Sequence, residues 1–325
     1  MLKAARVSIV MPCFNQARFL NEAIASLTAQ TIEDWECIIV NDGSTDETQD
    51  LAVSHSKRDD RIRYVSQANR GLSAARNTGL SHCRGGLVQF LDCDDKLERS
   101  KLATQCCFLD DNPGVGLVYG DARYFISEEP ESYFFSLFRD VSEPWIPNLW
   151  NSGRPVLDLL VNQNIMPVNS PLLRRSVIEK TGSFDESLKA LEDWDYWVRC
   201  AARGVRFEYL APSGSLALIR SHPASMSRDR GRMLRGLLDF RLRFARHVRD
   251  PQLRLENLLL AKSILNQVPR REAFHRCMHL AWESWSLKTS AALVERLFRR
   301  MLRRRASSLP PSKSPPNILT DTCAH

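Results

Sequence analysis

The sequence predicts an α/β domain with a mainly parallel sheet, followed by a helical and basic C-terminal region. Short apolar runs of the kind found in buried strands alternate with segments of helical apolar spacing, which is typical of such sheets. Polar and acidic residues come directly after several of these runs. Ligands bind beyond the carboxyl ends of the strands in this fold class, so these loops are the expected functional loops.

The alternation is regular over the first 91 residues. Predicted strands cover residues 7–11, 35–40, 61–65 and 87–91, and predicted helices cover residues 17–30, 46–55 and 73–82. Pro12 is expected to end the first strand, because proline has no backbone N–H to donate. A helix at 101–109 and a strand at 116–119 follow.

The pattern is weaker beyond residue 119. The stretch from about 127 to 154 is irregular and rich in aromatic residues, proline and glutamate, so we expect a mobile or partner-dependent insertion there. Regular patterning returns at 169–175 and at 192–204, where Trp194, Trp197 and Val198 share one helical face. We therefore divide the chain into a domain at 1–225, a helical basic region at 226–306 and a Pro- and Ser-rich tail at 307–325, predicted to be disordered.

Cysteine usage and the apolar runs favour a cytoplasmic protein that is soluble or peripheral on a membrane. The nine cysteines are odd in number, scattered and never in a CxxC pair, which favours neither a disulfide framework nor a zinc site. The first residues lack the apolar stretch and cleavage site of a signal peptide. No run of about 18 apolar residues predicts a transmembrane helix.

The net charge of +7 is unevenly distributed. Residues 223–325 carry 21 Lys or Arg and 8 Asp or Glu, a net charge of +13, which leaves −6 for residues 1–222. Within 293–305, apolar residues would form a stripe along one side of a helix and arginines would lie on the other side. This is the pattern of a helix in an anionic membrane interface. A helix packed on the first domain with solvated arginines explains this pattern equally well. Nucleic-acid binding is not favoured, because no aromatic residues are interleaved with the basic run.

The acidic cluster Asp92-Cys93-Asp94-Asp95 follows the predicted strand at 87–91. Three carboxylates in four residues repel one another unless a cation or hydrogen-bond donors compensate. Magnesium is often shared between carboxylates and substrate phosphates, so the cluster indicates a metal-bound diphosphate. A solvated loop with a helix N-cap at Asp95 explains an isolated cluster equally well.

Asp42 follows a second predicted strand, in a loop whose Gly43 and Ser44 permit close approach of a ligand. A turn followed by a helix N-terminus capped by Ser44 or Thr45 is the simpler alternative. Neither this loop nor the acidic cluster decides the function alone.

The order of the motifs is more specific than any one of them. The motifs are Val7–Asn15, Val40–Asp46, Asn69–Gly79, Phe90–Asp95, Lys180–Glu186 and Leu191–Trp197. This series resembles the family 2 glycosyltransferases over about residues 5–225. The resemblance implies the GT-A fold, a Rossmann-like sheet flanked by helices, with a nucleotide-binding half at about 1–120 and an acceptor half at about 121–225.

The resemblance also implies roles for individual residues of the donor site. The uracil or thymine base would be held by the segment at 12–15 and by Asp42, with Arg70 or Arg76 nearby. Asp92 would contact the ribose or the metal, and Asp94 would ligate Mg²⁺ or Mn²⁺ at the diphosphate. Cys93 stands where alanine is commoner. The residues of the first segment are Pro12, Cys13, Phe14 and Asn15.

The second half must supply a base, because an unactivated hydroxyl is a poor nucleophile at neutral pH. By resemblance, Asp193 would deprotonate the acceptor and Glu192 would orient neighbouring groups. The alternative is that both residues only lie in the first turn of a helix, where the helix dipole favours acidic side chains. His222 occupies a place where similar enzymes bring a histidine to the metal or diphosphate, and a hydrogen-bonded loop histidine is the alternative.

These features predict a metal-dependent, inverting glycosyltransferase. We expect transfer of one sugar from a nucleotide-diphosphate sugar, UDP or dTDP in preference, to a hydroxyl of a glycan or lipid-linked acceptor. The Gln-x-x-Arg-Trp sequence and the membrane helices of similar processive synthases are absent from the sequence. The alternative is a non-catalytic module of degenerate transferase fold that binds nucleotide sugars or glycans.

Overall fold

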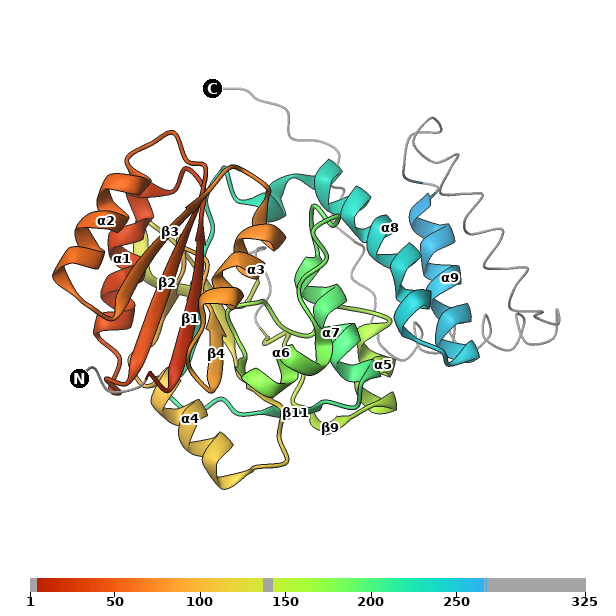
Figure 1. Cartoon of the computed structure of the whole chain (residues 1–325). Coiled ribbons are helices and arrows are strands. Elements are labelled where there is room, and N and C mark those ends of the chain that lie inside the picture. Colours follow the sequence, from red (N-terminus) through yellow and green to blue (C-terminus); the bar gives the residue numbers. More distant parts are fainter. Residues whose placement is uncertain (1–4, 137–142, 266, 268–325) are drawn as a thin grey trace.

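A computed structural model describes residues 5–136, 143–265 and 267 of the chain (Figure 1). Its larger sheet has eight strands in the order β3-β2-β1-β4-β10-β6-β11-β9. These strands are β1 (Val7–Cys13), β2 (Trp35–Asp42), β3 (Ile62–Gln67), β4 (Leu87–Phe90), β6 (Leu117–Tyr119), β9 (Trp150–Ser152), β10 (Leu172–Arg174) and β11 (Arg206–Tyr209).

The first four strands of this sheet are parallel, which confirms the predicted mainly parallel core. β10 is antiparallel to both of its neighbours, β4 and β6, and β9 closes the far edge against β11. Every residue of β1 and β2 is buried, because helices cover both faces of this half of the sheet.

The prediction that Pro12 ends the first strand is wrong. β1 continues to Cys13, and Pro12 pairs in register with Val40 of β2. Pairing of β1 with β4 ends at Val10. The nitrogen of Pro12 points toward β4, as that of Val10 does, but β4 no longer pairs with β1 at this position. The missing N–H of Pro12 therefore breaks no hydrogen bond of the sheet.

Three helices cover the parallel strands. α1 (Ala17–Thr28) and α2 (Thr48–Arg58) lie on one face, and α3 (Leu72–His82) lies on the other (Figure 1). α3 approaches β1 closely at Gly79, where a Cβ atom would lie 2.4 Å from Cγ1 of Val10. α4 (Lys101–Asp111) follows the acidic cluster by five residues, so that cluster is not a helix N-cap.

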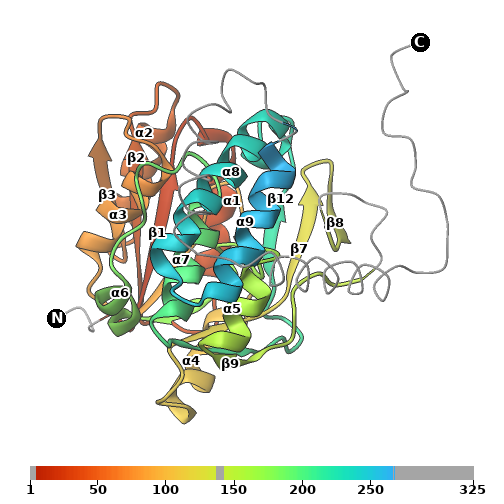
Figure 2. The same ribbon diagram turned by 90° about the vertical axis from the view of Figure 1, so that its right-hand side faces the viewer.

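A smaller sheet brings residues from near position 220 next to the acidic cluster. It has the order β5-β12-β7-β8 and lies on the side of the molecule away from β3 (Figure 2). Its strands are β5 (Lys96–Leu97), β7 (Ala122–Ile126), β8 (Glu129–Phe134) and β12 (Ala217–Arg220). Because β12 pairs with β5, the residues that follow β12 reach the acidic cluster that precedes β5.

The stretch at 127–154 is more regular than predicted. It contains β8 and β9, and β8 pairs antiparallel with β7. Both strands are sheet edges and most of their side chains are exposed, so the sequence shows no buried apolar pattern there. Residues 137–142 of this stretch lie outside the described part of the chain.

The remaining helices pack beside the sheet. α7 lies between α5 and α8, and α8 pairs with α9 (Figures 1 and 2). Trp194, Trp197 and Val198, which were predicted to share one face of a helix, are buried in α7, and Trp194 stacks on Phe240 of α8 at 4.3 Å between ring centroids. These elements are α5 (Arg154–Leu160), α6 (Arg175–Thr181), α7 (Glu192–Ala202), the short 3₁₀ helix η1 (Met226–Arg228), α8 (Arg230–His247) and α9 (Pro251–Leu265).

The predicted helical character of the C-terminal region is confirmed as far as residue 265. The predictions for 293–305 and for 307–325 fall outside the described residues. Among the helices that the structure describes, none is long and apolar enough to cross a membrane.

Candidate active site

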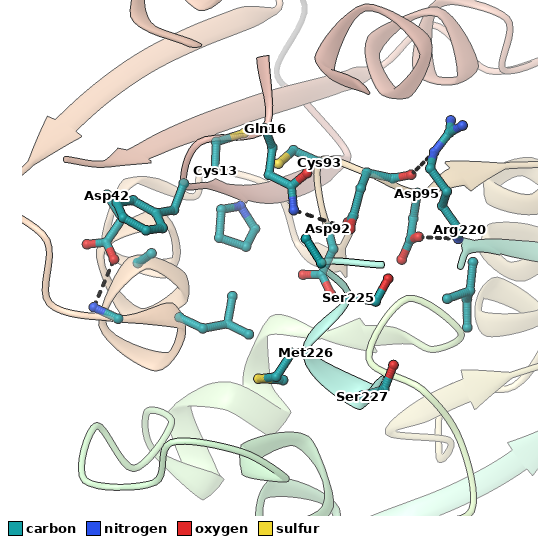
Figure 3. Close-up of a pocket in the computed structure, with 18 of the residues that line it drawn as sticks. Cys13, Gln16, Asp42, Asp92, Cys93, Asp95, Arg220, Ser225, Met226 and Ser227 are labelled. Atoms are coloured by element: carbon teal, nitrogen blue, oxygen red, sulfur yellow. Dashed lines mark hydrogen bonds between the residues drawn. The ribbon is translucent and has the colours of Figure 1, made fainter. Parts of the chain in front are cut away.

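A pocket of about 500 Å³ opens at the carboxyl ends of β1, β2 and β4, where the sequence predicted the ligand site (Figure 3). Five chain segments meet there: the end of β1, the end of β2, the loop into α3, the acidic cluster, and the segment from the end of β12 to α8. The predicted residues that line it are Pro12, Cys13, Phe14, Asp42, Asp92, Cys93 and Asp94.

Asp42 holds the loop at 67–71 against the pocket. Its carboxylate accepts hydrogen bonds from Gln67 Nε2 at 2.7 Å, from the backbone N–H of Arg70 at 2.9 Å and from that of Gly71 at 2.8 Å. The side chain is buried, so these three donors offset the loss of water around its charge. Asp42 therefore shapes the wall of the pocket as well as lining it.

The loop after β1 presents one aromatic side chain to the pocket. Phe14 lines the pocket and is 48% exposed, a high value for a large apolar side chain. Asn15 is not among the lining residues. Its backbone has φ +53°, its N–H donates to Ser44 Oγ at 3.0 Å, and its Oδ1 accepts from the N–H of Thr45 at 2.8 Å. Asn15 thus ties this loop to the loop after β2.

The two pocket cysteines lie against each other in the wall (Figure 3). Cys13 and Cys93 are both buried. Contact with the Cys13 thiol and burial raise the pKa of the Cys93 thiol well above its usual range. Both therefore act as small apolar packing residues at the base of the pocket.

The three carboxylates of the acidic cluster have different environments. Asp95 is buried, accepts the backbone N–H of Arg220 at 2.7 Å and bonds to Asn169 Nδ2. Burial, followed by the charges of Asp94 and Asp92, raises the pKa of Asp95 well above its usual range. Asp95 therefore fastens the cluster to β12 at the wall of the pocket, which it lines together with Asp92 and Asp94.

Arg76 joins the acidic cluster to the second half of the domain. Its guanidinium is buried and donates to Asp92 Oδ1 at 2.7 Å and to Glu192 Oε1 at 2.5 Å. Arg70, the other predicted arginine, does not line the pocket and pairs on the surface with Glu186 at 2.8 Å. Of the two arginines, only Arg76 connects candidate site residues.

His222 reaches Asp94 from the loop after β12. Its Nε2 lies 3.0 Å from Asp94 Oδ2, and its ring packs against Phe19 with 5.0 Å between centroids. The other ring nitrogen, Nδ1, is buried without a hydrogen-bond partner. Gln16 Nε2 also donates to Asp94 Oδ2, at 3.4 Å. The structure thus brings together Asp94 and His222, which are 128 residues apart.

Glu192 and Asp193 form the first turn of α7. Asp193 is partly buried, and its carboxylate accepts Asn164 Nδ2 at 3.1 Å and the N–H of Trp194 at 2.7 Å. Burial and the neighbouring Glu192 charge raise the pKa of Asp193 to about 7. A carboxyl group of that pKa can exchange a proton with a substrate near neutral pH.

Tyr124 of β7 is close enough to Asp95 and Asp193 for both charges to act on its hydroxyl. Burial, followed by the charges of Asp95 and Asp193, raises the pKa of the Tyr124 hydroxyl. Its ring therefore lies within the electrostatic influence of a carboxylate from each half of the domain.

Sequence reasoning missed several residues that complete the site. Asn169 accepts the backbone N–H of Asp92 at 3.1 Å, and Arg220 donates from Nε to the carbonyl of Asp94 at 2.8 Å. Arg220 stands two residues before His222, a spacing that could have suggested it. The side chains that the prediction omitted are Gln16, Asn69, Asn164, Asn169, Arg220 and Arg232.

Within the described residues, no group of three or more His, Cys, Asp or Glu side chains is arranged to hold a metal ion. Asp94 and His222 are two candidate ligands, and Asp92 is engaged by Arg76.

Comparison with known proteins identifies the family. Residues 8–181 match the family described as Glycosyl transferase family 2. The chain belongs to this family. As a family 2 glycosyltransferase it is an enzyme, and the non-catalytic module considered from the sequence is not retained.

Named relatives agree with the family. The uncharacterized glycosyltransferase EpsJ of Bacillus subtilis is 49% identical over 89 residues, which are 27% of this chain and 26% of EpsJ. An uncharacterized glycosyltransferase of Rickettsia typhi is 33% identical over 195 residues, 59% of this chain and 58% of that protein. The match thus spans less than two thirds of either relative.

Solved structures show that this family 2 glycosyltransferase has the GT-A fold. Residues 1–349 of Staphylococcus aureus TarS in complex with UDP align with a TM-score of 0.60 and 17% identity, over 82% of this chain and 76% of that one. The mannosyltransferase PcManGT of Pyrobaculum calidifontis, in complex with GDP-Man and Mn²⁺, aligns with a TM-score of 0.57 and 18% identity, over 94% and 81%. At these identities the likeness is one of fold.

Proposed function

We propose that this glycosyltransferase transfers one sugar from a nucleotide-diphosphate sugar, UDP or dTDP in preference, to a hydroxyl of a glycan or lipid-linked acceptor, with inversion. The pocket at the ends of β1, β2 and β4 supports the donor part of the proposal. Its exposed Phe14 offers a face for a base, and Asp92 keeps Oδ2 for a ribose hydroxyl because Arg76 engages Oδ1. TarS and PcManGT, which share the fold, were solved with UDP and GDP-Man.

We propose Mg²⁺ or Mn²⁺ as the cofactor, held by Asp94 and His222. Asp94 Oδ2 and His222 Nε2 lie 3.0 Å apart, so both atoms would be able to contact one divalent ion. Two protein ligands leave positions for diphosphate oxygens and water, as magnesium sites usually do. Such an ion supplies a Lewis acid that offsets charge on the leaving nucleoside diphosphate.

Asp193 is the proposed base. An acceptor hydroxyl is a weak nucleophile unless a neighbouring group takes its proton, and a pKa near 7 suits that exchange at neutral pH. Glu192 would orient the site through Arg76, which it shares with Asp92. A single displacement at the anomeric carbon inverts its configuration.

The link from Asp92 through Arg76 to Glu192 carries the proposal, because it holds the donor pocket and the proposed base in one rigid arrangement. The test measures donor hydrolysis and thermal stabilisation with UDP-, dTDP- and GDP-sugars, with and without Mn²⁺. We expect a UDP- or dTDP-sugar to stabilise the protein in a manner that requires Mn²⁺. Absence of stabilisation by every nucleotide diphosphate would refute the donor assignment.

The base is tested separately with Asp193→Asn, which keeps the shape of the side chain. We expect transfer to fall by at least about 10³-fold, while the donor dissociation constant changes less than twofold. Asp158→Asn, on the exposed face of α5, is the matched control. Parallel loss of transfer and donor binding would reject Asp193 as the base.

Contact of residues 293–305 with an anionic membrane remains a prediction from the sequence. The test is vesicle binding by the whole chain with Arg303, Arg304 and Arg305 replaced by glutamine. We expect weaker binding to vesicles of anionic lipid, by about 1 kcal/mol for each arginine. Unchanged binding would count against contact through this segment.

A further inference from the structure

An arginine cluster stands at the mouth of the donor pocket. It comprises Arg228 of η1 and Arg230, Arg232 and Arg235 of α8, all exposed. Asp229 is the single acidic residue between Ser221 and Gly236, and its carboxylate caps α8 by accepting the N–H of Arg232 at 2.9 Å. Within the described chain, no carboxylate lies within 4 Å of a guanidinium nitrogen of these four arginines, whereas Arg243 on the same helix pairs with Asp185.

The position of the cluster is fixed on two sides. Arg232 lines the pocket together with Ser225, Met226 and Ser227. Its Nε donates to the carbonyl of Lys189 at 3.0 Å. The first turns of α8 therefore stand between the donor pocket and the chain that leads into α7.

Close packing holds this arrangement. A Cβ atom on Gly236 would lie 2.7 Å from Cβ of Ala190, so α8 rests directly on the residues before Glu192 and Asp193. A Cβ atom on Gly231 would lie 3.4 Å from Nη1 of Arg235, which shows that the Arg235 guanidinium folds back over the first turn of α8. The cationic groups thus gather at the pocket end of the helix.

The donor diphosphate does not account for the whole cluster. Only Arg232 lines the pocket, and Arg228, Arg230 and Arg235 lie outside its lining. The exposed Lys189 adds a fifth positive charge beside them. Because α8 packs on Ala190, the cluster lies beside the segment that leads to Glu192 and Asp193.

We propose that the arginine cluster binds a phosphate group carried by the acceptor. Guanidinium groups bind phosphate through paired N–H donors, and several unneutralised guanidinium groups close together favour a dianion over a neutral sugar. The proposal rests on the proposed function and specifies its acceptor as a phosphate ester. Two sources share this chemistry, a lipid phosphate and a polyol phosphate.

The experiment measures binding by titration calorimetry with the donor site filled by saturating UDP and Mn²⁺. The probes are decyl phosphate and glycerol 3-phosphate, with decyl glucoside as the neutral counterpart, each below its micelle concentration. We expect the whole chain to bind at least one phosphate probe and to bind decyl glucoside at least tenfold more weakly. Preference for decyl phosphate identifies the lipid source, preference for glycerol 3-phosphate identifies the polyol source, and equal affinity supports recognition of the phosphate alone.

The variant replaces Arg228, Arg230 and Arg235 with glutamine and leaves Arg232 in place. We expect at least a tenfold rise in the dissociation constant of the phosphate probe, with UDP affinity changed less than twofold. The distal control replaces the exposed Arg246 and Arg249 with glutamine, at the other end of α8, and is matched in charge to the double variant Arg230→Gln/Arg235→Gln. The double variant Arg230→Gln/Arg235→Gln keeps the bond from Arg228 to Ser221 and serves if the triple variant is unstable.

Four results would overturn the proposal. The first three are no binding of either phosphate probe, equal losses in the cluster variant and the distal control, and a parallel loss of UDP affinity. A fourth is weaker binding of the cluster variant to phosphatidylglycerol vesicles with unchanged binding of both phosphate probes, because the cluster would then bind a membrane. Loss of activity in Asp193→Asn has no bearing on these binding results, so failure of the proposed base is distinguishable.

Discussion

Asn164 donates a hydrogen bond from Nδ2 to Oδ2 of Asp193 at 3.1 Å, and the N–H of Trp194 occupies the other oxygen of the carboxylate. Asn164 belongs to the loop after α5. That loop is anchored at its start by α7 and α8, because Trp194 Nε1 donates to the carbonyl of Leu160 at 2.8 Å and Arg241 donates to that of Val161. The proposed base therefore has a fixed orientation.

We predict that Asn164→Ala raises the pKa of Asp193, because the donor that it removes stabilises the charged carboxylate. A hydrogen bond to a charged group contributes about 1.5–3 kcal/mol, which corresponds to about one to two pKa units. The acidic limb of the kcat profile should move upward by that amount, with a smaller loss at pH 9. The measurement is kcat from pH 5.5 to 9.

Asn162→Ala is the control for this substitution. Asn162 lies in the same loop but is exposed and bonds to Asp158 and Glu256. Its kcat profile should match that of the unaltered enzyme. An acidic limb in Asn164→Ala at the unaltered position would show that Asn164 does not act through Asp193.

The raised pKa of Asp193 has a consequence for stability. The folded carboxyl group titrates near pH 7 and the unfolded one near pH 4, so the folded protein binds the additional proton between these values. The stabilisation of the folded state by this proton is fully present below about pH 4 and is lost as the pH rises to about 7. We predict that Asp193→Asn stabilises the protein by up to about 4 kcal/mol at pH 8 and has little effect at pH 4.

Urea unfolding of Asp193→Asn and the unaltered enzyme at both pH values checks this prediction. Asp158→Asn, which alters an exposed carboxylate, should show a difference below about 1 kcal/mol throughout. A destabilised Asp193→Asn at pH 8 would mean that the charged carboxylate is favoured by its surroundings in the folded protein.

Arg76 and Arg70 should respond very differently to replacement by methionine. Arg76 is buried between two carboxylates, and its removal leaves both without their partner, at a cost of about 3–5 kcal/mol. Arg70 forms one exposed ion pair, which contributes less than about 1 kcal/mol. Urea unfolding of the two variants at pH 7 measures the difference. Similar free energies of unfolding would contradict the buried linkage.

Apolar patterns predicted the first seven elements, most clearly at β1, β2 and β4, where every residue is buried. Their observed ends differ from the predicted ones by at most three residues. β8 and β9 were missed for the opposite reason, since edge strands with exposed side chains need no apolar pattern. The antiparallel insertion of β10 between β4 and β6 is likewise set by the packing of distant segments and has no local signal.

The site was predicted where it depends on strand ends. Asp42, Asp92 and Asp94 follow parallel strands, and the pocket brings them together. Asn169 and Asn164 act through hydrogen bonds to residues 77 and 29 positions away, which no local spacing reveals. Asn15 was predicted to bind the donor, whereas its hydrogen bonds to Ser44 and Thr45 join two loops.

Lys101 gives a prediction that is independent of the active site. Its ammonium group is buried and donates to Gln89 Oε1 at 2.8 Å and Gln105 Oε1 at 2.7 Å. Among the described residues no carboxylate lies within 4 Å of it, and burial lowers its pKa to about 7. Between pH 7 and about 10 the unfolded chain therefore holds a proton that the folded protein has released.

We predict that the free energy of unfolding rises less steeply with pH in Lys101→Met than in the unaltered protein. In the unaltered protein this lysine adds at most about 1.4 kcal/mol per pH unit from pH 7 to 10. Methionine leaves two glutamine oxygens without their donor, so the diagnostic quantity is the slope of the unfolding free energy and not its absolute value. Urea unfolding from pH 7 to 9.5 measures that slope, with exposed Lys57→Met as the control. Equal slopes in all three proteins would mean that Lys101 stays charged in the folded state. The slope differs only if the buried amine of the folded protein loses its proton at a lower pH than the amine of the unfolded chain.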